Sequence, residues 1–352
     1  MRARQLPQAL PMRDLDQAVD DLGDRWQALD GMTLFFTGGT GFVGAWMTSV
    51  LLRALDRGLL SASVRLLSRS PEKVQAELPW IASHPAIELV RGDVLRDGWD
   101  CHGCTHLVAG ATEASAKLLR EQPRLMFDTI LDGTRRTLDR AREAGIQRAL
   151  FISSGAVNGS QPQGVTHVAE QQFFGPDPLR VSSAYAEGKR GAEQLFAFEG
   201  RAGLSFSVAR LWAFVGPLLP LDQHFAVGNF LNDALHGQCI QVQGDGMTVR
   251  SYQYAAEMAA WCWSILAAGG NGEAYNVGSE EAVTMCELAR LCADLGGVNG
   301  VDILGVSDAA RAVDMYVPST QLIKNELGSS DFILLRDALR RTMAWYSLGS
   351  NA

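Results

Sequence analysis

The stretch FFTGGTGFVGAW, residues 35–46, decides the fold class of this chain. An apolar run leads into glycines spaced G-x-x-G-x-x-G at Gly38, Gly41 and Gly44, and an apolar helical pattern follows. Glycines permit a tight turn and a close backbone approach to a pyrophosphate, while a helix N-terminus supplies unpaired N–H groups and a positive dipole. The motif therefore predicts a dinucleotide-binding loop. The alternative is a tight turn between strand and helix that binds nothing.

Short apolar runs alternate with longer helical stretches from Met32 onward. The expected strands cover residues 32–37, 63–68, 87–92, 105–111, 148–153 and 204–212. Such alternation predicts an α/β fold of the Rossmann type, in which a doubly wound parallel sheet is covered by helices on both faces.

Three parts are expected along the chain. Residues 1–30 form an N-terminal helical extension with one helix over 12–29, and residues 31–212 form mainly the NAD(P)-binding Rossmann domain. Residues 213–352 form mainly a smaller, discontinuous α/β substrate-binding region, with segments that return to the Rossmann domain. In that last part we expect helices over 226–236, 254–268 and 282–295, and strands at 240–243 and 274–279.

Composition limits the function classes. The 352 residues carry a net charge of −8, which disfavours nucleic acid as a partner. No run of eighteen apolar residues predicts a membrane-spanning helix, and the N-terminus lacks the apolar core of a secretory signal. The cysteines at 101 and 104 have no second pair of ligands at a useful spacing, so we expect reduced cysteines, no metal and a cytosolic location.

The ends of the next strands extend the expected cofactor site. Ser68 and Arg69 stand where an acidic residue would bind the adenosine ribose. Arg69 can pair with a 2′-phosphate, which favours NADP over NAD; the alternative is a solvated arginine. Asp93 is placed either to accept from the adenine amino group or to cap the next segment. Further cofactor contacts are expected from Thr40, Phe42, Val43, Val94, Ala109, Gly110, Ala111 and Trp212.

The stretch YAEGK, residues 185–189, places Tyr185 and Lys189 four residues apart, on one face of a helix. A free tyrosine has a pKa of about 10, which a nearby ammonium and a positive nicotinamide ring would lower. Ser154, at the end of the fifth expected strand, offers a hydroxyl group. The three residues predict an acid/base site, and Tyr185 and Lys189 are also expected to contact the cofactor. The alternatives are an ordinary surface helix and a plain strand end.

The motifs TGGTGFVG, SSGAVNG, YAEGK, RSYQY and YNVGS, in this order, resemble the extended short-chain dehydrogenase/reductase family. Within it, the chain is similar to the NAD(P)-dependent epimerase/dehydratase group that acts on nucleotide sugars. The resemblance implies a homodimer in which Tyr185 is the acid/base, Lys189 its partner and Ser154 a hydrogen-bonding partner of the sugar. It also implies hydride transfer to the cofactor and a transient 4-keto sugar.

The substrate residues follow from the same resemblance. Asn229 matches a position that contacts the diphosphate or base in relatives. Arg250 matches an arginine that binds phosphate in relatives. The alternative role for Arg250 is a surface salt bridge. Glu113 follows the fourth strand and is a candidate for facing the sugar.

Four positions depart from the family pattern. Relatives that remove water carry an Asp-Glu pair after the hydroxyl residue, and decarboxylating relatives carry a glutamate at the second of these positions; here they are Gly155 and Ala156. Asn158 and Ala213 replace a usual tyrosine and asparagine. Without the acids, 4-epimerisation is the simplest reaction left. The alternatives are an NADPH-dependent 4-keto sugar reductase, a dehydratase that uses Glu113, and a nucleotide-sensing protein without activity.

Overall fold

A seven-stranded parallel sheet forms the centre of the molecule in the computed structural model, which describes residues 9–112, 116–221, 225–306, 312–329 and 333–348. The strand order is β3-β2-β1-β4-β5-β6-β11, which confirms the predicted doubly wound sheet. The strands are β1 (Met32–Thr37), β2 (Ala62–Ser68), β3 (Ile87–Arg91), β4 (His106–Ala109), β5 (Arg148–Ser154), β6 (Ser205–Leu211) and β11 (Ala274–Val277).

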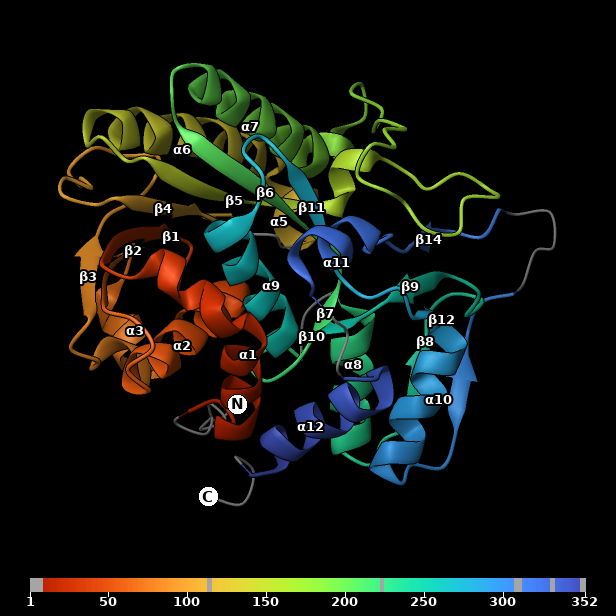
Figure 1. The fold of residues 1–352 in the computed structure, drawn as a ribbon. Coiled ribbons are helices and arrows are strands. Elements are labelled where there is room, and N and C mark those ends of the chain that lie inside the picture. Colours follow the sequence, from red (N-terminus) through yellow and green to blue (C-terminus); the bar gives the residue numbers. More distant parts are fainter. Residues whose placement is uncertain (1–8, 113–115, 222–224, 307–311, 330–332, 349–352) are drawn as a thin grey trace.

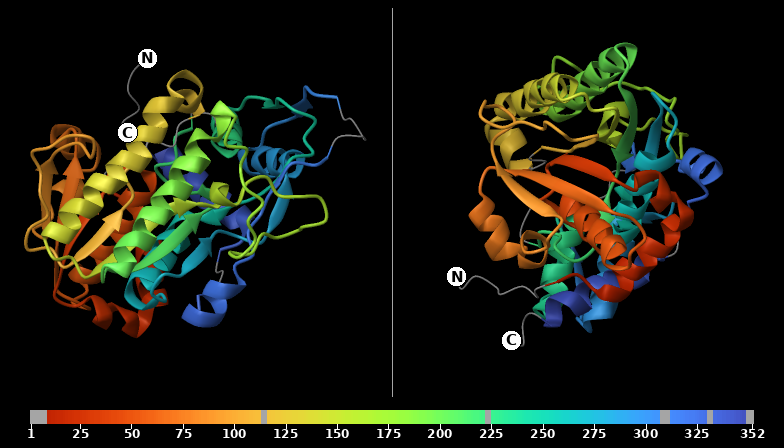
Figure 2. Two further views of the ribbon diagram at one scale, coloured as in Figure 1. Left: turned by 90° about the horizontal axis from the view of Figure 1, so that it is seen from above. Right: turned by 60° about the vertical axis from the view of Figure 1, so that its left-hand side comes forward.

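Helices cover both faces of this sheet (Figure 1). On one face lie α6 (Pro123–Glu143) and α7 (Ala184–Arg201), which run side by side in Figure 2. On the other lie α1 (Met12–Leu22), α2 (Phe42–Asp56) and α9 (Ala255–Ala268). Side chains alternate along the strands, so Leu34 and Phe36 join the core beneath α2 and α9, while Phe35 joins the core beneath α6 and α7.

Short elements complete the Rossmann part. They are α3 (Pro71–Glu77), α4 (Pro79–Ala82), α5 (Ala116–Glu121) and the 3₁₀ turns η2 (Gly155–Asn158) and η3 (Val181–Ser183). The cysteines at 101 and 104 pack into the core beneath α6, where burial raises the pKa of both thiols. Within the described residues, no helix is both long and apolar enough to cross a bilayer.

The chain after β6 builds small sheets beside the end of the main sheet where β6 continues into β7 (Figure 1). The strands pair as β10-β7 (Gln253–Tyr254, Phe214–Val215), β12-β9-β14 (Ala282–Thr284, Val249–Ser251, Met315–Tyr316) and β13-β8 (Val301–Ile303, Ile240–Val242). The helices around them are α8 (Ala226–Leu235), α10 (Met285–Gly296), α11 (Gln321–Leu327) and α12 (Leu335–Leu348).

Two expected helices have different bounds from those predicted. The helix expected over 282–295 begins only at Met285, because residues 282–284 pair with β9 and Thr284 forms a capping box with Glu287. The single helix expected over 12–29 is interrupted at Gly23, where φ is 52°. The 3₁₀ turn η1 (Gly23–Leu29) follows it.

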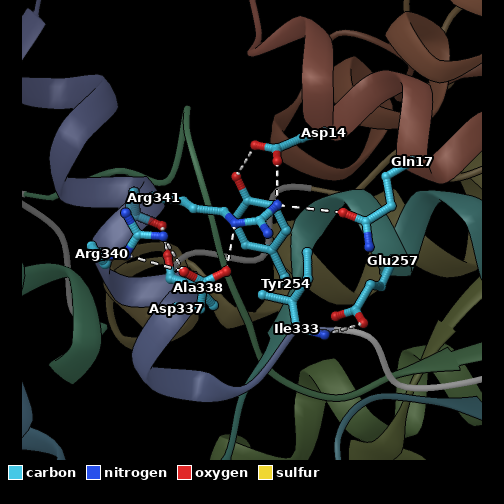
Figure 3. Close-up of polar contacts among 10 residues, drawn as sticks. Asp14, Gln17, Tyr254, Glu257, Ile333, Asp337, Ala338, Arg340 and Arg341 are labelled. Carbon is cyan, nitrogen blue, oxygen red and sulfur yellow. Dashed lines mark hydrogen bonds and ion pairs between the residues drawn. The ribbon is translucent and has the colours of Figure 1, made fainter.

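A buried polar cluster attaches the N-terminal extension to the body (Figure 3). Asp14 on α1 is 3% exposed, accepts a hydrogen bond of 2.6 Å from the Tyr254 hydroxyl and forms an ion pair with Arg341 of α12. Since a buried carboxylate without partners is costly, these contacts specify how α1, β10 and α12 meet. The extension is thus packed against the strand that follows Arg250 in sequence.

Candidate active site

The glycine loop between β1 and α2 has no space for a side chain at two of its glycines. A Cβ on Gly38 would lie 2.5 Å from the carbonyl of Gly110, and φ at Gly38 is +81°, in the left-handed region. A Cβ on Gly44 would lie 2.3 Å from the carbonyl oxygen of Gly38. Side chains at these two positions would collide with backbone, so both glycines are required by the loop itself.

Gly41 has a different environment. Its φ of −79° suits any residue, and a Cβ there would meet no atom nearer than 3.8 Å. Gly41 is exposed and forms the N-cap of α2, whose first turn contains Phe42, Val43 and Gly44 with Thr40 just before. The N–H groups of the first turn of a helix have no partner within the helix, and Gly41 leaves the space beside this turn open. This arrangement fits the pyrophosphate of a dinucleotide, because a phosphate can approach where the protein itself places nothing.

Thr37 links the ends of β1 and β4, which border the glycine loop, by hydrogen bonds. Its Oγ1 accepts from the N–H groups of Gly110 (3.2 Å) and Ala111 (3.3 Å), directly after Ala109 of β4. Thr37 was not among the predicted site residues, although it stands in the same motif just before the first glycine. It holds the β1 and β4 ends together beneath the expected cofactor backbone.

At the adenosine end, Ser68 is buried and its hydroxyl accepts from the N–H of Ser70, whereas Arg69 is exposed. Asp93 accepts a hydrogen bond of 2.9 Å from the N–H of Leu95. This contact favours the interpretation of Asp93 as a local cap. Val94 is buried and packs against Gly133 of α6.

The three residues of the expected acid/base site come together at the end of β5. Ser154 is the last residue of β5, and its hydroxyl interacts with Tyr185 in the first turn of α7 in a way that lowers the pKa of the tyrosine. Lys189 follows one turn later, is 3% exposed, and donates to the carbonyl oxygen of Ile152 at 2.7 Å. Each of these elements is anchored in the core, so the site is held rigidly.

Burial dominates the electrostatics of this cluster. It raises the pKa of Tyr185, and the hydrogen bond with Ser154 offsets part of that increase. It lowers the pKa of Lys189 to about 7, against the attraction of Glu193. Both shifts favour the neutral form, so the free protein keeps the proton on Tyr185.

An ion pair between Glu193 and Arg210 lies beside Lys189, and it was not predicted from the sequence. Glu193 lies one turn after Lys189, pairs with Arg210 of β6 at 2.8 Å and accepts from the Ser153 hydroxyl at 2.6 Å. The signal was available in YAEGKRGAE, where a carboxylate follows the lysine at i+4 on the same helix face.

Aromatic side chains leave no space for a side chain at position 155. A Cβ on Gly155 would lie 2.5 Å from the Trp212 ring and 2.7 Å from the hydroxyl of Tyr316. The two rings pack with centroids 4.2 Å apart, and the Trp212 indole donates to Asn276 at 2.9 Å. Trp212 was expected beside the cofactor, and Tyr316 was not expected at the site at all.

The expected substrate residues lie on separate elements. Arg250 on β9 forms an ion pair with Asp314 at 2.6 Å, and its guanidinium lies 5.9 Å from the centroid of the Tyr316 ring. Arg250 therefore lies next to the aromatic rings at position 155. It forms a surface salt bridge, which was the alternative to phosphate binding. Asn229 is exposed in the first turn of α8. Glu113 lies outside the described residues.

A Rossmann sheet with a glycine loop and a Ser-Tyr-Lys cluster at the end of β5 defines the class of extended short-chain dehydrogenases/reductases. The profile of the NAD dependent epimerase/dehydratase family matches residues 34–278. The chain belongs to that family and is an enzyme of the epimerase/dehydratase type.

Individual relatives agree with this assignment. The chain is 28% identical over 311 residues to UDP-glucuronic acid decarboxylase 6 of Arabidopsis thaliana, covering 88% of this chain and 87% of that protein. It is 26% identical to UDP-glucuronic acid decarboxylase 1 of Xenopus tropicalis, covering 90% and 72%.

Solved structures share the fold. DesIV, a dTDP-glucose 4,6-dehydratase of Streptomyces venezuelae determined with NAD bound, has a TM-score of 0.77 at 26% identity, covering 91% of this chain and 98% of that one. UDP-glucose 4-epimerase of Thermotoga maritima, determined with UDP-glucose, has a TM-score of 0.75 at 21% identity, covering 90% and 99%.

Proposed function

We propose that the enzyme epimerises a nucleotide-activated sugar at C4, with NAD(P) as cofactor. One observation carries this proposal: the Ser154–Tyr185–Lys189 cluster is assembled, while position 155 has neither an acid nor room for one. Elimination of water needs a group that protonates the leaving hydroxyl. Epimerisation needs only one acid/base that works in both directions.

The residues of this chain then have the following roles. Tyr185 takes the proton of the sugar 4-hydroxyl and later returns it, and Ser154 donates a hydrogen bond to the same oxygen. Lys189, when protonated, stabilises the Tyr185 phenolate through its positive charge. The cofactor, when bound, accepts a hydride from C4 and gives it back. Return of the hydride to the opposite face of the rotated 4-keto sugar inverts C4.

A second candidate follows from the similarity to UDP-glucuronic acid decarboxylases. Oxidation of a uronic acid at C4 places a ketone β to the carboxylate, and such acids lose CO₂ readily. The same cluster would perform the oxidation. Ala156 argues against this candidate, because decarboxylating relatives carry a glutamate there.

A third candidate, NADPH-dependent reduction of a 4-keto sugar, is favoured by the exposed Arg69 at the end of β2. A guanidinium at this place matches the 2′-phosphate of NADP in charge and geometry. Arg69 also supports NADP as the cofactor of the epimerase.

The deciding experiment incubates the protein with UDP-, GDP-, CDP- and dTDP-sugars, including UDP-glucuronic acid, with NAD or with NADP in either redox state. Mass spectrometry and NMR of the sugar identify the product. An unchanged mass with inverted C4 supports epimerisation; loss of CO₂, loss of water or gain of two hydrogens assigns the decarboxylase, dehydratase or reductase instead. The control is Tyr185→Phe, which should lower turnover by about 10²-fold or more while cofactor affinity stays near the wild-type value. Undiminished turnover in that variant would contradict the role of Tyr185.

A further inference from the structure

Glu193 lies on α7 one turn after Lys189, and both side chains reach the same strand, β5. Nζ of Lys189 donates to the carbonyl oxygen of Ile152 at 2.7 Å and lies 5.0 Å from the centroid of the Phe151 ring. The hydroxyl of Ser153 donates to the Glu193 carboxylate at 2.6 Å. Since Phe151 and Ser153 are two residues apart in the strand, their side chains point to the same face. The lysine and the glutamate therefore lie beside each other over that face of β5.

Arg210 of β6 holds the Glu193 carboxylate in this place. Its Nε and one terminal nitrogen donate to the two carboxylate oxygens at 3.0 and 2.8 Å, the two-pronged contact that a guanidinium forms with a carboxylate. The Arg210 side chain is 4% exposed, and its other terminal nitrogen donates to the carbonyl oxygen of Glu170 at 2.7 Å. The Phe173 ring lies over the guanidinium, with its centroid at 5.0 Å. The position of the carboxylate is thus fixed by β6 and the segment around Glu170 as well as by α7.

Lys189 faces ionisable groups of α7 and β6. Tyr185 precedes it by one turn and Glu193 follows it by one turn, while Arg210 contacts the Glu193 carboxylate directly. The turns η2 and η3, which also pack on α7, contain no ionisable side chain. The Glu193 carboxylate is thus the negative charge that these elements bring to the lysine.

The neighbouring helix α6 brings apolar groups to this part of α7. Ile130 lies against Gly188, and Leu131 lies against Gly191. The acidic residues of α6 near these contacts form ion pairs within their own helix, Asp128 with Arg124 and Asp132 with Arg135. The interface with α6 therefore adds burial around Lys189 without a charge that would compensate it.

Burial and the carboxylate act on Lys189 in opposite directions. Burial favours the neutral amine, which has no charge with which to stabilise a phenolate. In the folded protein burial lowers the pKa of Lys189 to about 7, and the Glu193 carboxylate opposes this decrease. Without the carboxylate, the lysine would lose its proton at a still lower pH.

We propose that Glu193 is a positioning residue of the acid/base site: Arg210 and Ser153 hold its carboxylate beside Lys189, and this fixed negative charge keeps the lysine in its ammonium form. The inference deepens the proposed function and rests on it in one respect, namely that the ammonium stabilises the Tyr185 phenolate. Glu193 acts on the reaction through Lys189.

The test measures the titration of Lys189 in Glu193→Gln. The sequence contains four lysines, at 73, 117, 189 and 324, so NMR of protein labelled with ¹³C at lysine Cε has at most four side-chain signals to separate. Lys189→Met identifies the signal of Lys189 by its loss. The wild-type midpoint should lie near pH 7, and Glu193→Gln should lower it by about one pH unit, because an opposite charge is lost and Arg210 is left unpaired. An unmoved midpoint would overturn the proposal.

Glu199→Gln is the matched control. Glu199 also lies on α7, pairs with Arg142 at 2.7 Å and has a side-chain exposure of 16%, against 17% for Glu193. It follows Lys189 by ten residues, about 15 Å along the helix axis, so its loss should leave the midpoint in place. An equal shift in this control would mean that loss of any ion pair of α7 disturbs Lys189, and the proposal would fall.

A double variant keeps the test independent of the fate of Arg210. Glu193→Gln leaves Arg210 as an unpaired buried charge, which is strongly destabilising. Should that variant not fold, Glu193→Gln combined with Arg210→Met removes both charges. The Lys189 midpoint should still fall by about half a pH unit or more, since the carboxylate is absent. A midpoint equal to that of the wild type would exclude the role of Glu193.

Turnover provides a second readout. A midpoint that moves from about pH 7 to about pH 6 lowers the charged fraction of Lys189 at pH 7 about fivefold. In Glu193→Gln we therefore expect kcat near pH 7 to fall about fivefold, with KM for the sugar within about twofold. An unchanged kcat beside a shifted midpoint would contradict the role of the ammonium in the proposed function. The titration needs no substrate, so if no sugar is oxidised at C4 the proposed function fails, and the midpoint still decides whether Glu193 holds the charge on Lys189.

Discussion

The burial of Lys189 predicts that Lys189→Met changes how folding stability depends on pH. Burial lowers the pKa of this ammonium from 10.5 to about 7 in the folded protein. Between these two values the unfolded chain holds a proton on Lys189 that the folded protein lacks. Raising the pH through this window therefore favours the folded state, and the stability gain is complete only above the unfolded value. Lys189→Met removes this dependence.

The magnitude follows from the size of the shift. A difference of about 3.5 pKa units corresponds to about 5 kcal/mol over the whole window, at about 1.4 kcal/mol per unit. Between about pH 7 and pH 9 roughly 2 kcal/mol of this gain accrues. Methionine also leaves the carbonyl of Ile152 without the donor it has at 2.7 Å, but this cost is the same at both pH values and cancels in the comparison.

The assay is urea unfolding of wild type and Lys189→Met at about pH 7 and about pH 9, because the change in their stability difference isolates Lys189. We expect the wild type to gain roughly 2 kcal/mol relative to the variant on going to the higher pH. Lys73→Met on α3 is the control for loss of a lysine, since its side chain is 68% exposed. A stability difference of the same size at both pH values would refute the argument that burial governs Lys189.

Two other predictions concern Gly155 and Arg69. Gly155→Ala should destabilise the fold by about 1–3 kcal/mol and lower turnover, because the new methyl group collides with Trp212 and Tyr316. Gly244→Ala is the matched control, since a Cβ there meets nothing within 4 Å, and equal unfolding midpoints for the two variants in urea would contradict this account. Arg69→Ala should weaken NADP binding about tenfold relative to NAD, as expected for loss of a charge-assisted hydrogen bond. Calorimetric titration with both cofactors measures the ratio, and an unchanged ratio would show that Arg69 does not read the 2′-phosphate.

The main sheet was predictable because its strands are short, apolar and separated by helical periodicity. β1 has the predicted bounds, residues 32–37, and the glycine loop follows it directly. The short strands β9 and β14 were not predicted. They cover two or three residues each, too few for an alternating pattern, and they pair segments that are remote in sequence. Their pairing depends on the tertiary fold and not on local preference.

The acid/base residues were accessible to sequence reasoning for a similar reason. Tyr185 and Lys189 share one turn of helix, and Ser154 ends a predicted strand, so spacing alone relates them. Glu193 extends the same helical series and was overlooked. Tyr316 has no such relation in sequence to these motifs, because only the fold of the last third of the chain brings its hydroxyl beside Gly155.

The missing acid at position 155 gains a structural meaning from this arrangement. A side chain at Gly155 and the hydroxyl of Tyr316 would occupy the same volume beside Ser154, as the 2.7 Å separation requires. A side chain at position 155 and the hydroxyl of Tyr316 therefore exclude each other in this packing. Where an acid could protonate a leaving hydroxyl, this site holds a tyrosine whose pKa is raised by burial, so that it stays protonated. We infer that this packing restricts the proposed reaction to proton and hydride transfer at C4, with Tyr185 as the acid/base.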